Sequence, residues 1–86
     1  MEFPEIYRVW VQRALQSLGG RGSIVQVARQ IWRDHEPDLR AAGDRFYTWQ
    51  YDFRWAATWL RGAGLMRGSD DSPTGLWELT EAGKRS

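Results

Sequence analysis

The absence of cysteine is the feature that most restricts how this 86-residue chain can fold, because it rules out disulfide bonds and thiolate metal sites. The single histidine, His35, likewise rules out a site built from several His ligands. A chain of this length buries only about 60–65% of the surface that it exposes when unfolded. Stability must therefore come from packing, for which six Trp, three Tyr and three Phe are present. The length allows one domain, residues 1–86.

Apolar residues at helical spacing predict two helices in the first half of the chain. The first covers residues 1–18 and ends at the glycine-rich segment 19–22, since glycine readily takes the left-handed conformation of a helix end. Ser23 and Gln26 have the S-x-x-Q form of a capping box and predict the start of the second helix. Pro37 either ends this helix or begins a new one, which would be a short turn over 38–42.

A third helix is predicted from about Tyr47 to Arg61, and the glycines that follow end it. Its expected core stripe has members at i, i+4, i+7 and i+11, which are Trp49, Phe53, Ala56 and Leu60. Trp55 and Trp59, one turn apart, are expected to flank this stripe.

Two short strands are predicted at residues 65–67 and 76–79, joined by a turn-rich loop, and residues 80–83 predict a final cap and turn. A two-stranded hairpin is not stable alone, so it must pack on the helices. The predicted fold class is therefore mainly α with a small β-hairpin. The order of elements is that of a winged helix-turn-helix with three helices and a two- or three-stranded wing. The linker between the second and third helices is longer than the usual turn of about 3–4 residues.

Two runs of this sequence resemble a known family. The run FRWAATWLRGAGL at residues 53–65 is similar to the "RWA…L…AGL" run on the third helix of the N-terminal winged helix domain of Mrr-type restriction proteins. The run LWELTEAG at residues 76–83 resembles the strand that follows the wing in the same family. Both runs stand in the expected order, and the resemblance extends over most of the chain.

The resemblance implies a module that recognises DNA and is usually joined to a separate nuclease domain. The D-x-n-(D/E)-x-K pattern of such nucleases is not found, because the only lysine is Lys84, close to the last residue of the sequence. The chain is accordingly expected to be either a fragment of a larger restriction protein or a stand-alone reader. Neither a catalytic step nor a cofactor or metal is expected.

The outward face of the third helix is the predicted DNA contact, because the second helix of a helix-turn-helix enters the major groove. Gln50 could pair with adenine, and Arg54 could bind guanine or a phosphate. Hydroxyl groups on the same helix could donate to phosphates. The predicted contacts on this helix are Tyr47, Thr48, Gln50, Tyr51, Arg54, Thr58 and Arg61. The alternative is an ordinary solvated helix face.

Further candidate contacts lie outside this helix. They are Arg45, Arg67 and Ser69, with Ser72 and Thr74 beside them in the wing, and Arg21, Ser23, Gln26 and Arg29 near the start of the second helix. Asp70 and Asp71 argue against close approach of a phosphate to the wing tip, where a plain hairpin is an equal alternative. For Ser23 and Gln26, capping alone is a sufficient explanation.

Six aromatic residues fall within residues 46–55, more than one helical core stripe needs. The surplus suggests a pocket for a methyl group carried by a base, formed by Phe46, Tyr47, Trp49 and Tyr51. Winged helix domains of methyladenine-dependent restriction enzymes are similar in this region, which implies a reader of N6-methyladenine in duplex DNA. The alternative is that the aromatic residues only enlarge a small core.

The charge pattern leaves two functional classes open. The net charge is only +1, but eleven of the twelve basic residues are Arg, and residues 39–67 carry a net charge of +3. Arginine suits phosphate and guanine, although a GC-rich genome would also favour its codons. The alternative function is a module for protein–protein interaction or dimerisation without DNA specificity. No apolar run reaches the length of a membrane span or a secretory signal, so a cytoplasmic, nucleoid-associated protein is expected.

Overall fold

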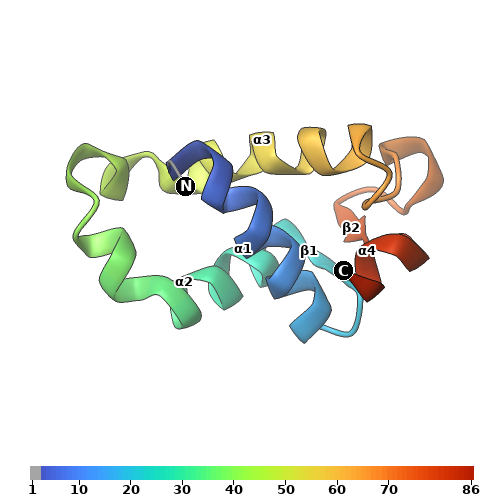
Figure 1. The fold of residues 1–86 in the computed structure, drawn as a ribbon, viewed down its shortest axis with the longest axis horizontal. Helices are drawn as coiled ribbons and strands as arrows, with labels where there is room; N and C mark the ends of the chain where they lie inside the picture. Colours follow the sequence, from blue (N-terminus) through green and yellow to red (C-terminus); the bar gives the residue numbers. More distant parts are fainter. Residues whose placement is uncertain (1–2) are drawn as a thin grey trace.

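Two helices, α2 (Ile24–Arg40) and α3 (Trp49–Gly62), lie along opposite long sides of the molecule, and α1 (Phe3–Ser17) runs between them (Figure 1). The structure is a computed structural model that describes residues 3–86. A short 3-10 helix, η1 (Gly43–Tyr47), joins α2 to α3 at one end, and the small sheet and α4 (Glu81–Arg85) close the other end (Figure 1). The prediction of a mainly helical fold with a small antiparallel sheet is confirmed.

The start of α2 is the one that the sequence predicts. The Ser23 side chain accepts a hydrogen bond from the Gln26 backbone N–H at 3.1 Å, and the Gln26 side chain accepts one from the Ser23 N–H at 2.8 Å. The kink before Pro37 divides α2 into two helical segments, and the second, short segment runs through Pro37 to Arg40, which agrees with the predicted alternative that Pro37 begins a new helical turn. His35 leaves helical geometry (φ −133°, ψ 20°), and α2 kinks there because proline removes a donor and crowds the preceding turn.

The start of α3 also differs from the prediction. Tyr47 is the last residue of η1, and Thr48 is the N-cap of α3, which begins at Trp49. The Thr48 hydroxyl donates to Asp52 Oδ2 at 2.8 Å instead of capping a backbone N–H. At the other end, Gly64 adopts φ +76°, which lets the chain leave α3 toward the sheet.

The sheet pairs segments far apart in sequence. Strand β1 (Arg21–Ser23) runs antiparallel to β2 (Leu76–Glu78), with Gly22 opposite Trp77. The predicted strand at 65–67 is reduced to a bridge between Met66 and Leu79, supported by the Arg67 N–H donating to Glu78 O at 2.8 Å. The loop between them contains a second 3-10 turn, η2 (Ser69–Asp71).

One hydrophobic core joins the three long helices to the sheet. The predicted stripe of α3 is confirmed, since Trp49, Phe53, Ala56 and Leu60 are each at most 4% exposed. Trp55 and Trp59, which were predicted to flank the stripe, are 65% and 44% exposed. They lie beside Ala56 in a hollow between α1 and α3, where their rings are only partly covered.

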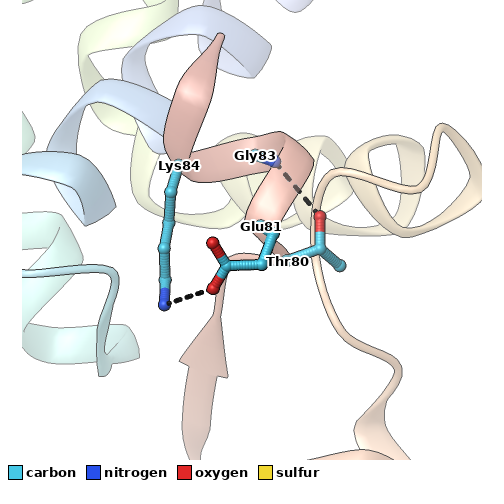
Figure 2. Close-up of polar contacts among 4 residues, drawn as sticks. All are labelled: Thr80, Glu81, Gly83 and Lys84. Carbon is cyan, nitrogen blue, oxygen red and sulfur yellow. Dashed lines mark hydrogen bonds and ion pairs between the residues drawn. The ribbon is translucent and has the colours of Figure 1, made fainter.

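The short helix α4 is fixed to the rest of the fold through Thr80 and Gly83. Thr80 Oγ1 accepts a hydrogen bond from the Gly83 N–H at 3.1 Å, and Lys84 lies 3.5 Å from Glu81 (Figure 2). The Gly83 carbonyl accepts hydrogen bonds from Gln12 and Gln16 of α1 at 2.9 and 3.0 Å. The predicted cap at 80–83 is therefore present, and it ties the C-terminal turn to α1.

Candidate nucleic-acid interface

A groove of about 640 Å³ opens between the first half of α2, η1 and the first half of α3. Buried and half-buried apolar side chains form its floor, and exposed side chains form its rim. The lining residues are Ile24, Val25, Ala28, Arg29, Trp32, Phe46, Tyr47, Trp49, Gln50, Phe53 and Arg54. We call this feature the α2–α3 groove.

The charged groups of the α2–α3 groove are all positive. Arg29 comes from α2 and Arg54 from α3, both are exposed, and the lining contains no carboxylate. Gln50, one turn before Arg54, adds an exposed amide that can both donate and accept. The groove can therefore hold an anion with a polar edge against an apolar floor.

Aromatic rings run in contact from the groove rim into the core. Tyr47 lies edge-on to Phe46 at 5.2 Å between ring centroids, and Phe46 lies 6.1 Å from Trp32. Trp32 stacks on Trp49 at 6.0 Å with an angle of 10° between their planes. Trp49 continues the series to Phe53 at 5.9 Å. Because Trp49 is only 3% exposed, it supports the floor and is not a contact surface.

Tyr51 does not belong to the α2–α3 groove. The structure brings Phe46, Tyr47 and Trp49 together there, whereas Tyr51 is 65% exposed on another side of α3 and lines no part of it. Trp32 of α2 lines the groove in place of Tyr51. Trp32 was not predicted as part of this pocket because it lies on another helix, α2, and is distant in sequence from residues 46–51.

The other predicted contacts on α3 are dispersed. Thr58 is exposed outside the groove, and the Thr48 hydroxyl is engaged with Asp52. Arg61 is half-buried, and its Nε donates to the Arg67 carbonyl oxygen at 3.0 Å, which fixes the turn after α3. Of the seven residues predicted on the outward face, the groove therefore collects Tyr47, Gln50 and Arg54.

The residues predicted to lie in a wing are at the opposite end of α3. Arg67 is exposed and shares a shallow, polar depression with Arg21 of β1, together with Glu78 and Lys84. Ser69 is exposed at the start of η2, followed by two exposed aspartates. This end therefore carries both signs of charge, in contrast to the α2–α3 groove.

A second hollow, of about 270 Å³, lies between α1 and α3. The Arg8 guanidinium sits 4.4 Å from the centre of the Trp59 ring, a cation–π contact. Arg45 lies here and not in the groove, which separates it from Gln50 and Arg54.

The same hollow contains Tyr7. Burial raises the pKa of Tyr7 to about 12, the charge of Asp52 adds a smaller increase, and the charge of Arg45 lowers this pKa. In the sequence, the four-residue spacing of Tyr51, Trp55 and Trp59 was the pattern that could have indicated an aromatic face on this side of α3.

His35 has a packing role that the sequence did not predict. Its ring stacks on Trp10 with 3.9 Å between centroids, and its Nδ1 lies 3.6 Å from Asp38 Oδ2. Within residues 3–86, no group of three or more His, Asp or Glu side chains is arranged to hold a metal ion. In the same part of the chain, no helix is both long enough and apolar enough to cross a membrane.

Comparisons with protein-family models, with curated proteins and with solved structures found no match to this chain.

Proposed function

We propose that this protein is a winged helix module that binds double-stranded DNA, with α3 in the major groove and no catalytic step of its own. The single observation that carries the proposal is the α2–α3 groove, whose charged groups, Arg29 and Arg54, are both positive and exposed. The groove runs beside the N-terminal half of α3, the part that approaches base edges in helix-turn-helix proteins.

The order of elements supports the winged helix assignment. Strand β1 lies between α1 and α2, and β2 pairs with β1 on one side and with the segment at Met66 on the other. The loop at 68–75 then occupies the position of a wing, and α2 and α3 form the helix-turn-helix with η1 in the turn. The resemblance of residues 53–65 and 76–83 to Mrr-type restriction proteins agrees with this order and suggests a nuclease as the functional partner.

The polar groups of the groove have distinct roles in this proposal. Arg54 points from α3 to guanine or to a phosphate, and Gln50 reads an adenine edge. Arg29 neutralises a phosphate from the α2 side. Two arginines on opposite walls fix the register of the duplex, while the amide supplies base discrimination.

The apolar floor favours a reader of N6-methyladenine. Phe46 and Trp32 are half-buried, so each presents part of a ring in the groove, and Tyr47 is 83% exposed at its rim. An N6-methyl group projects into the major groove, where contact with an apolar surface is more favourable than contact with water. Rings held in place by the core can supply this surface without a loss of side-chain freedom.

Replacing Arg54 by alanine is expected to weaken binding to duplex DNA by at least about tenfold, because the variant loses one charged contact from the centre of the interface. The slope of log affinity against log salt concentration should fall by about one, since one fewer counterion is released. The measurement is fluorescence anisotropy of a labelled duplex at several salt concentrations.

Arg13→Ala is the matched control, because Arg13 is exposed on α1 and lines none of the grooves described above. It removes the same charge and should change the affinity by less than about twofold. Equal losses of affinity in the two variants would mean that only the net charge matters, and would contradict the groove as the DNA-binding site. A wild-type chain that binds no duplex at low salt would reject DNA binding itself.

A duplex carrying N6-methyladenine is expected to bind about fourfold more tightly than the same duplex without it, the value of one buried methyl group at about 0.8 kcal/mol. Titrating the two duplexes in parallel measures this ratio. Tyr47→Ala should reduce the preference while leaving most of the affinity for unmodified DNA. Identical affinities for the methylated and unmethylated duplex in several sequence contexts would remove the methyl-reading role.

A further inference from the structure

Three aromatic side chains form an exposed stripe on α3 that the DNA-binding proposal does not use. Tyr51, Trp55 and Trp59 are 65%, 65% and 44% exposed and stand four residues apart. Side chains at this spacing lie above one another on a helix and form one ridge. We call it the 51–55–59 ridge.

The charges around the 51–55–59 ridge do not suit nucleic acid. Arg8 and Arg45 border it, and so does the carboxylate of Asp52. Glu5 stands on the same side of α1 one turn before Arg8, and its exposed carboxylate balances the second arginine. The hollow beside the ridge therefore carries charges of both signs, whereas the α2–α3 groove carries only positive charge.

We propose that the 51–55–59 ridge is the interface with a second copy of this chain, packed antiparallel about a two-fold axis at Trp55. The ridge is symmetric in sequence position, so in such a pair Trp55 meets itself and Tyr51 of each copy meets Trp59 of the other. Ridges of i±4 spacing pack into each other in the commonest class of helix–helix contact. A two-fold contact needs a surface that complements itself, which this ridge provides.

Charge complementarity supports the antiparallel arrangement. Arg8 sits on the Trp59 ring at one end of the ridge, and Asp52, one residue after Tyr51 in the sequence, lies toward the N-terminal end of α3. Rotation about Trp55 brings Arg8 of each copy toward Asp52 of the other, twice in the pair. A parallel arrangement would instead place the two Arg8 guanidinium groups at the same end.

The size of the ridge determines the expected strength of the pair. At roughly 200 Å² for each aromatic side chain, the exposed parts of the three rings offer on the order of 350 Å² per copy. A standard interface buries about 800 Å² per partner, so neighbouring parts of α1 must contribute and the pair should dissociate reversibly. The α2–α3 groove lies on a different side of α3 and stays open in the pair, so the inference does not depend on DNA binding.

Sedimentation equilibrium of the full chain, without DNA, tests the pair. The wild type should show a reversible monomer–dimer equilibrium between micromolar and millimolar concentration. Trp55→Ala should raise the dissociation constant at least about tenfold, equal to about 1.4 kcal/mol. Tyr47→Ala is the matched control, since it removes a still more exposed aromatic ring that belongs to η1, outside the 51–55–59 ridge, and should leave the dissociation constant unchanged.

A cross-linking experiment locates the axis. The sequence has no cysteine, so Trp55→Cys introduces the only thiol, and a short bifunctional maleimide should couple two such chains efficiently. Tyr47→Cys should couple poorly under the same conditions, and circular dichroism verifies that both variants fold. A wild type that stays monomeric at millimolar concentration overturns the proposal. So does a dimer unaffected by Trp55→Ala, or equal coupling of the two cysteine variants.

Discussion

Gly83→Ala is expected to lower the free energy of unfolding by about 3 kcal/mol and the melting temperature by on the order of 15 °C. A Cβ atom at this position would overlap the Leu65 carbonyl oxygen. That carbonyl cannot retreat easily, because it accepts a hydrogen bond from the Thr80 N–H at 3.1 Å. Gly83 itself is held by its hydrogen bond to Thr80 (Figure 2). Its carbonyl oxygen also accepts hydrogen bonds from the two glutamines of α1. Relief of the overlap must therefore break part of this network.

The control for this prediction is Gly62→Ala at the end of α3. A Cβ there would meet no atom within 4 Å, and alanine is the better helix former. The variant should gain stability of about 0.5 kcal/mol. Thermal unfolding followed by circular dichroism measures both variants. A Gly83→Ala protein as stable as the wild type would mean that α4 does not pack on Leu65 in solution.

Phe53→Ala is expected to lower the free energy of unfolding by about 4 kcal/mol. Phe53 is 1% exposed, and its ring lies 5.9 Å from Trp49 and 5.7 Å from Trp77 of β2. It thus joins α3 to the sheet, and the cavity left by alanine would have aromatic walls that cannot collapse readily. For a domain of ordinary stability, about 5–15 kcal/mol, the loss is a large share of the total.

Tyr51→Ala, two residues earlier, is the control for Phe53→Ala. Its ring is 65% exposed, so its removal should change the free energy of unfolding by no more than about 0.5 kcal/mol. Urea denaturation at low protein concentration, where the chain is monomeric, measures both variants. Similar losses at positions 51 and 53 would contradict the orientation of α3.

The side of α3 that is buried was predictable, because four apolar residues at regular spacing specify one buried side. Trp49, Phe53, Ala56 and Leu60 leave only one orientation in which all are covered. The degree of exposure of Trp55 was not predictable, because the size and apolar character of a Trp ring favour burial, whereas the number of places in a small core limits it. The sequence contains more large rings than residues 3–86 bury, and only the packed structure determines which are left outside.

Elements that depend on distant partners could not be predicted. Strand β1 has the sequence Arg-Gly-Ser, which carries no alternation of apolar and polar residues, and it is a strand only because residues 76–78 pair with it. The opposite error occurred at Met66, where an apolar run predicted a strand that amounts to a single bridge. The groove was found only in part for the same reason, since Trp32 joins it from another helix.

The parallel rings of Trp32 and Trp49 have an optical consequence. Two indoles 6.0 Å apart with an angle of 10° between their planes are close enough for their electronic transitions to couple. Where the two transition dipoles are skewed within their ring planes, such coupling contributes a pair of bands of opposite sign to the circular dichroism of aromatic side chains, and its size depends steeply on separation and orientation. Because one ring belongs to α2 and the other to α3, these bands report how far apart the two helices stand, without any attached label.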